Sequence, residues 1–277
     1  MTRCLARESK SGQTKFRSYK TEMSRFLPPL RTILPAEHGS WFMLGFPMVL
    51  GLLLRPSRAG ACLALAALAF FLGRPPLRRL LNGQKDLAQA RALVLLGAST
   101  VALGLAALLL SDFRFLISLV LVSPLVALAL RADLDRAVRS LNVEMAAQGA
   151  FAGLASAILL AGGATPAEAG RAWLFVSLVG AANLAHVRRI LGHAHRLEAP
   201  ELAQRRIPVQ VLHLLLLALS ALLLATRGLA GALWTGWTVL LYLRALAPYR
   251  PIPARKLGWR EGGLSVIGLL LLWRALL

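Results

Sequence analysis

The chain has 277 residues, of which 57% are hydrophobic, and its 32 Lys and Arg residues outnumber the 12 Asp and Glu residues by 20. A soluble nucleic-acid-binding protein would share the positive charge but would not carry long uncharged apolar runs. A multi-pass membrane protein accounts for both features, because its spans exclude charge and the loops between them concentrate it. The composition therefore predicts an integral membrane protein with membrane lipids as partners and no nucleic acid.

Residues 1–34 are polar and basic throughout, without the apolar core that a signal peptide needs. We expect a disordered basic head over 1–34, followed by a single transmembrane domain over 35–277. A span needs about 20 mainly apolar residues. The sequence from residue 35 onward predicts an all-α, polytopic bundle of about nine transmembrane helices, over residues 40–54, 59–73, 90–110, 113–130, 145–161, 172–185, 208–226, 229–243 and 262–277.

The distribution of basic residues predicts the orientation of these nine helices. With the N-terminus inside, the cytoplasmic segments would carry 26 of the 32 Lys and Arg residues, and the external segments would carry five. Cytoplasmic loops normally hold such an excess. We therefore expect a protein of the bacterial inner membrane with a cytoplasmic N-terminus and an external C-terminus.

Polar residues that membranes tolerate poorly gather at the cytoplasmic ends of the predicted helices, which is typical of a binding site or of buried pairs. We predict as catalytic candidates the residues that could handle a proton, namely Glu37, His38, Glu144 and His213. We predict as ligand-binding candidates the residues Arg74, Asn183, His186, Arg188, Arg189, Arg244, Lys256 and Glu261.

Each of these candidates has a structural alternative. Loop arginines also set orientation and contact anionic lipids, His213 could be a hydrogen-bonded core residue, and acids are favoured at helix N-termini in any case. The sequence contains no Gly-rich phosphate loop, no HExxH motif, no nucleophile elbow and no metal-binding cysteine pair. We accordingly predict no metal and no cofactor.

The stretch LPAEHGSWFMLGFPMVLG, which begins at Leu34, resembles the opening of the YwiC-like family of bacterial integral membrane proteins. Looser similarity to that family continues at Arg74–Leu77, Val187–Ile190, His213 and Lys256–Glu261. The family implies a membrane protein but supplies no biochemical activity.

Nine helices, an inward N-terminus and a polar cytoplasmic side are also similar to the UbiA-type prenyltransferases. That resemblance implies two Asp-rich loops that hold magnesium on a diphosphate, and the corresponding loops of this chain lack them. Asp86 alone, or Glu198 with Glu201, cannot supply the oxygen ligands that a hard cation needs. Arginines can instead bind a phosphate directly.

Two functional hypotheses follow from the sequence. In the first, the protein binds or acts on an anionic lipid or an isoprenoid-phosphate ligand in a cytoplasmic-side cavity, as an enzyme or a degenerate enzyme; a non-catalytic membrane protein is a further alternative. In the second, it is a transporter or channel for a small anion or polar solute, with histidines that respond to protons. The scarcity of polar residues in the outer halves of the helices favours the first hypothesis.

Overall fold

The structure of the chain is a computed structural model, and it describes residues 34, 38–84, 86–134, 140–194, 198–248 and 252–277. Apart from Leu34, the predicted basic head lies outside these residues, and so does Glu37. Within the described residues all regular secondary structure is helical, which confirms the predicted all-α class. The helices are α3 (His38–Leu54), α4 (Arg58–Leu81), α5 (Leu87–Leu110), α6 (Phe115–Leu134), α7 (Leu141–Ala161), α8 (Pro166–Ala194), α9 (Ala199–Leu246) and α10 (Ala254–Leu276).

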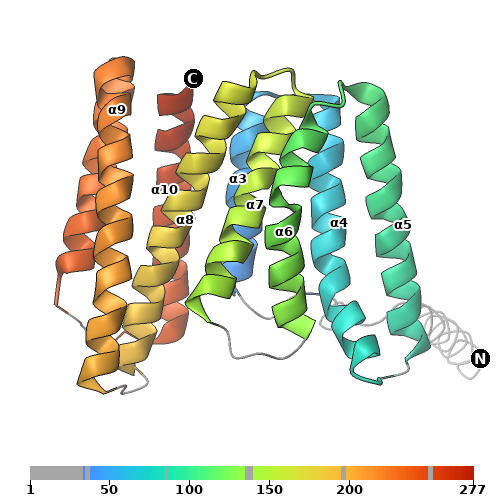
Figure 1. The fold of residues 1–277 in the computed structure, drawn as a ribbon, viewed down its shortest axis with the longest axis horizontal. Helices are drawn as coiled ribbons and strands as arrows, with labels where there is room; N and C mark the ends of the chain where they lie inside the picture. The colour runs from blue at the N-terminus through green and yellow to red at the C-terminus, as the bar shows by residue number, and fades with distance from the viewer. Residues whose placement is uncertain (1–33, 35–37, 85, 135–139, 195–197, 249–251) are drawn as a thin grey trace, which may run out of the picture. The chain divides into compact units, whose positions relative to one another are not determined.

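The helix α9 is a hairpin of two helical legs. Its backbone leaves the helical conformation at Gly228, where φ is +51° and ψ is −129°. Thr235 on the second leg donates a 2.9 Å hydrogen bond to the carbonyl of Ser220 on the first leg. Gly231 lies so close to the carbonyl of Leu223 that a Cβ atom there would collide with it. Since the two legs correspond to the predicted spans 208–226 and 229–243, each of the nine predicted spans has a helical counterpart among the described residues (Figure 1).

Six of the eight described helices, α4 to α9, are long and apolar enough to cross a membrane, and α3 adds a shorter apolar stretch over Trp41–Leu54. Several helices extend beyond the predicted spans: α4 continues through Pro75 and Pro76 to Leu81, and α8 reaches Ala194. The predicted bounds were too narrow because they followed the apolar core of each helix. Helices extend past the hydrocarbon layer into segments whose composition is polar.

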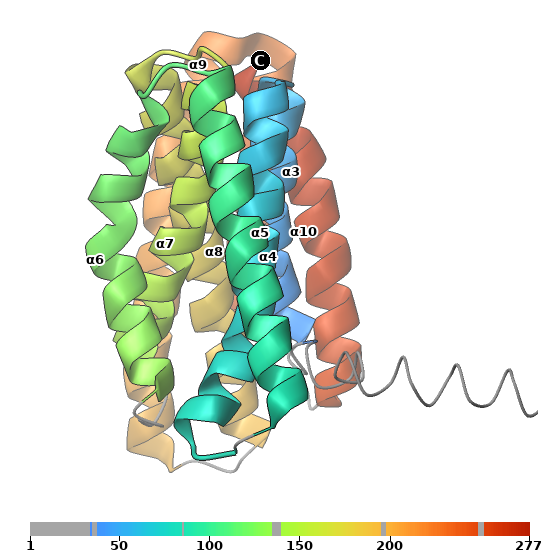
Figure 2. The ribbon, with the colours of Figure 1, turned by 90° about the vertical axis from the view of Figure 1, so that its right-hand side faces the viewer.

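The chain forms two compact units. In the first, the second half of α4 and the first half of α5 run antiparallel over residues 66–102 (Figure 2). A tight turn joins them, and Gly83 adopts the left-handed φ of +80° that this turn requires. The hydroxyl of Thr100 donates to the carbonyl of Ala66 at 3.5 Å.

The second unit comprises residues 37–65 and 103–277. Its centre is α7, which packs against α3, α6 and α8, while α9 packs on α8 and α10 packs on α3 and α9. Small residues on α7 permit close approach, as is common between membrane helices. A Cβ atom on Gly153 would collide with Val122 on α6, and Ser118 donates a 2.9 Å hydrogen bond to the Gly153 carbonyl.

The ends of the helices divide the second unit into two sides. One side, here called the site end, carries the start of α3, α7, α9 and α10 and the finish of α6, α8 and α9 (Figure 1). The opposite end carries the finish of α3, α7 and α10 and the start of α8. Within the second unit, α3 starts at the site end and α10 finishes at the opposite end.

Candidate functional site

Two ion pairs join neighbouring helices at the site end. Arg188 Nη1 on α8 donates to Glu144 Oε2 on α7 at 2.8 Å, with 24% and 23% of the two side chains exposed. Arg244 Nη2 on α9 donates to Glu261 Oε2 on α10 at 2.7 Å, with only 15% and 9% exposed. The more buried pair therefore holds the second leg of α9 against α10.

Arg244 also contacts His186, which in turn packs against His213. Its Nε donates to Nε2 of His186 at 3.2 Å, so the neutral His186 ring carries its proton on Nδ1. The His186 and His213 rings meet edge to face with centroids 6.2 Å apart. His213 in turn donates from Nδ1 to the carbonyl of Val209 at 2.7 Å. A single arginine thus links α8, α9 and α10.

Three atoms of this cluster are buried and have no hydrogen-bond partner among the described residues: Nδ1 of His186, Nη1 of Arg244 and Oε1 of Glu261. Buried polar atoms are nearly always partnered in folded proteins, by protein, water or ligand. The arrangement therefore leaves two donors and one acceptor able to bind a molecule that enters beside them.

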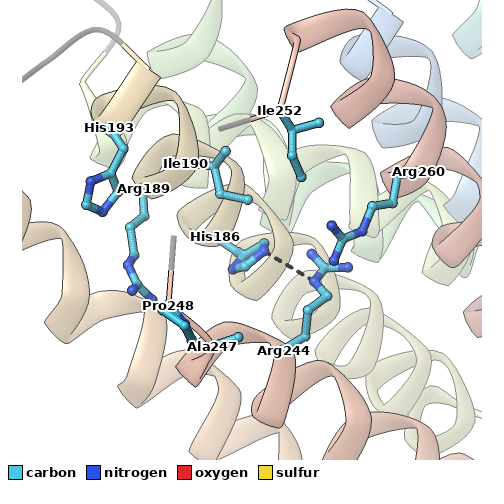
Figure 3. A pocket seen from close by; sticks show the side chains of 9 residues that line it. All are labelled: His186, Arg189, Ile190, His193, Arg244, Ala247, Pro248, Ile252 and Arg260. Carbon is cyan, nitrogen blue, oxygen red and sulfur yellow. Dashed lines mark hydrogen bonds between the residues drawn. The ribbon is translucent and has the colours of Figure 1, made fainter. Parts of the chain in front are cut away.

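A pocket of about 300 Å³ opens beside this cluster at the site end (Figure 3). Three arginines and two histidines line it, namely Arg189, Arg244, Arg260, His186 and His193, and its other lining residues are apolar. Arg260 and Arg244 lie within electrostatic reach of each other. No carboxylate lines this pocket among the described residues. We call it the cationic pocket.

A second cavity, also of about 300 Å³, lies between α3, α7, α8, α9 and α10. Aromatic and aliphatic side chains make up most of its wall, among them Phe42, Phe46 and Trp237. Polar groups also line it: Gln148, Asn183, His213, Arg244, Glu261 and Ser265. We call it the apolar cavity. Arg244 lines both this cavity and the cationic pocket.

The structure brings most of the predicted site residues to one end of the second unit. Those at the site end are Glu144, Asn183, His186, Arg188, Arg189, His213, Arg244 and Glu261, of which Glu144 and Arg188 pair with each other and line neither cavity.

The four other predicted residues are not among these contacts as far as the described residues show. Arg74 belongs to the first compact unit, where its guanidinium lies 5.9 Å from the Phe71 ring centroid. Lys256 is exposed on α10. His38 begins α3, and its side chain lies outside the described part, as does Glu37.

The predicted site did not include several residues that the structure places in it. Arg260 and His193 line the cationic pocket, and each could have been found from its spacing on the same helix as a predicted residue. Phe42, Phe46 and Trp237 line the apolar cavity, but an apolar side chain within an apolar span carries no signal of a cavity. Among the described residues no group of three or more His, Cys, Asp or Glu could hold a metal ion.

The apolar helices and the buried polar cluster at their ends define a multi-pass helical membrane protein. Over residues 34–159 the chain matches the family model described as YwiC-like protein, which confirms the resemblance of its opening motif to that family. No curated protein and no solved structure matches the chain. The matched residues end within α7, so most residues of the two cavities come from the part of the chain that follows them.

Proposed function

We propose that this protein binds an anionic lipid at the site end, with the phosphate in the cationic pocket and the hydrocarbon chain in the apolar cavity. The observation that carries the proposal is the shared position of Arg244, which lines both spaces. A ligand that fills both must be charged at one end and apolar beyond it. Lipid phosphates and isoprenoid phosphates have this construction.

The charges of the cationic pocket favour an anion. Three guanidinium groups line it, and among the described residues one carboxylate, that of Glu261, pairs with one of them, Arg244. Within the described part of the chain, Arg189 donates to a backbone carbonyl, that of Ala245. Guanidinium groups bind phosphate through two parallel N–H donors, and a bound phosphate would offset their mutual repulsion. The unpartnered Nη1 of Arg244 and Nδ1 of His186 are further donors for its oxygens.

The proposal places the site end at the cytoplasmic face of the inner membrane. The segments of the second unit that flank the site end, 131–144, 188–206 and 244–260, carry 13 Lys and Arg residues, whereas the rest of that unit carries six, and cytoplasmic loops keep such an excess. Anionic lipids of the cytoplasmic leaflet attract juxtamembrane arginines at that surface. The ligand would therefore reach the pocket from the leaflet in which the arginines already lie.

The test is lipid binding by the purified full-length protein in detergent, measured by native mass spectrometry. We expect phosphatidic acid to bind well above zwitterionic phosphatidylcholine. The double variant Arg189→Gln/Arg260→Gln should weaken phosphatidic acid binding at least about tenfold, since each lost charged hydrogen bond is worth roughly 1.5–3 kcal/mol.

The matched control is Arg114→Gln/Arg171→Gln, which removes two exposed charges from the opposite end and should change little. Separate arms with undecaprenyl phosphate and with inorganic phosphate distinguish the lipid sources from the free anion. Equal loss of binding in the two double variants, or no preference for the anionic lipid, would overturn the proposal.

A further inference from the structure

Two amide side chains line the apolar cavity with unused hydrogen-bonding capacity. Gln148 on α7 is only 4% exposed, and among the described residues its one hydrogen bond runs from Nε2 to the carbonyl of Val176 at 3.3 Å. Asn183 on α8 lines the same cavity and makes no hydrogen bond within the described part of the chain. An amide has two donor hydrogens and two acceptor lone pairs. Most of these positions therefore remain open.

The backbone of α8 is shaped to accept the Gln148 amide. A Cβ atom on Gly180 would collide with the end of the Gln148 side chain, so only glycine permits this amide to lie against the helix. Asn183 follows Gly180 by three residues and therefore shares its face of α8. Both amides line the apolar cavity, whose wall also includes the aromatic groups of Phe46 and Trp237.

The positions of these amides relative to the proposed phosphate can be measured along the α8 axis from His186. Asn183 precedes His186 by three residues, which is about 4.5 Å along the helix axis, and Gly180 precedes it by about 9 Å. His186 contacts Arg244 and lines the cationic pocket. A ligand whose phosphate meets Arg244 would thus place its next few bonds beside Asn183 and then beside Gln148.

We propose that Gln148 and Asn183 bind ester carbonyls, and that the ligand is therefore a glycerophospholipid and not an isoprenoid phosphate. The proposal rests on the proposed function and adds the class of lipid. In a phosphoglyceride the acyl ester carbonyls follow the phosphate after a few bonds, whereas an isoprenoid phosphate offers only hydrocarbon at that depth. The free amide hydrogens of both residues donate to these carbonyl oxygens, and both are specificity-determining residues.

The test compares three lipids on the purified full-length protein: dioleoyl phosphatidic acid, its ether-linked dialkyl analogue, which lacks both carbonyls, and undecaprenyl phosphate. We expect the ester lipid to bind roughly tenfold more tightly than the ether lipid, as loss of partners for buried amides implies. Gln148→Leu and Asn183→Leu should bring the ratio of the two affinities towards one, with binding of the ether lipid nearly unchanged.

Two further variants sharpen this test. Gly180→Ala leaves both amides in the chain but displaces that of Gln148, so it should reduce the ester preference as Gln148→Leu does. Ser220→Ala is the control, because Ser220 lines neither cavity and its buried hydroxyl donates to the carbonyl of Leu216 at 2.7 Å. Its ester preference should equal that of the wild type.

The outcomes separate the two proposals. Equal binding of ester and ether lipids by the wild type, or tighter binding of undecaprenyl phosphate, overturns the assignment to glycerophospholipids. If the Arg189→Gln/Arg260→Gln variant still loses anionic lipid in that case, the proposed function stands alone. Because the wild type decides between the three lipids, a variant that fails to fold does not prevent the test.

Discussion

The second unit carries a buried ion pair at its site end and an exposed one at its opposite end. Arg244 and Glu261 are 15% and 9% exposed and 2.7 Å apart, whereas Arg55 and Glu168 are 50% and 37% exposed and 3.4 Å apart. Arg244 and Glu261 lie on the neighbouring helices α9 and α10, whereas Arg55 lies just after the end of α3 and Glu168 lies on α8. Surface pairs contribute little to stability, while removal of one partner of a buried pair leaves an uncompensated charge.

The surroundings of the two glutamates differ as well. Glu168 completes a capping box at the start of α8, because Oε2 accepts from the Thr165 backbone N–H at 2.8 Å while the Thr165 hydroxyl accepts from the Glu168 N–H at 3.3 Å. Glu261 keeps one buried oxygen without a partner among the described residues. The capping box accounts for the position of Glu168. Glu261, in contrast, can accept a further hydrogen bond from a ligand.

The largest expected effect concerns which end faces the cytoplasm. Gln204 at the site end and Ala167 at the opposite end are both exposed, and each can be replaced by cysteine in a chain that lacks Cys4 and Cys62. In intact bacteria, a membrane-impermeant maleimide should label Ala167→Cys readily and Gln204→Cys only after lysis, because the basic residues retain the site end inside. Labelling of the two positions in the reverse pattern would contradict the proposed orientation.

Breaking the buried pair should have the next largest effect. Glu261→Leu leaves the Arg244 charge without its carboxylate, and we expect the free energy of unfolding to fall by about 3–5 kcal/mol. Chemical unfolding in mixed micelles measures this change. The double variant Arg244→Leu/Glu261→Leu removes both charges and should recover much of the loss. A double variant as unstable as the single one would show that the pair does not act as a unit.

The smallest effects are expected at the opposite end. Glu168→Ala should cost about 1 kcal/mol through loss of the capping box, and Arg55→Gln should cost at most about 0.5 kcal/mol because water already screens the exposed pair. The same unfolding measurements rank these two variants against Glu261→Leu. If Arg55→Gln lowered the free energy of unfolding as much as Glu261→Leu, the buried and exposed ion pairs would not differ in their contribution to stability.

The all-α class and the helices followed from the sequence because hydrophobic length is a local property. The sequence predicts a break between two helices at Arg227 and Gly228, because these residues interrupt the apolar run. The second leg of α9 follows this break, as predicted. The sequence predicted the ends of the helices less well. The helix α10 begins eight residues before the predicted span, and the prediction missed these residues because they are polar and basic. Composition locates the membrane-embedded part of a helix, whereas backbone hydrogen bonding decides how far the helix continues.

The sequence did not predict which residues the polar side chains contact. The spacing of Glu144 and Gln148 suggests one shared polar edge on α7, but Glu144 pairs with Arg188 while Gln148 lines the apolar cavity. Residues four apart share a helix face yet differ in depth by about 6 Å, and that difference is enough to meet different neighbours. The sequence also did not predict that Trp237 and Phe42 line the apolar cavity, because this cavity is the space between five packed helices.

The sequence by itself determined that this is a multi-pass helical membrane protein with its polar groups concentrated at one side, because charge and apolar length act through the solvent around each segment. Only the tertiary structure decided that Arg244 binds both Glu261 and His186 and lines two cavities. It also decided that Gly180 makes room for the Gln148 amide. Contacts of this kind join residues 17 to 58 positions apart in the chain, and their geometry depends on how whole helices pack against one another.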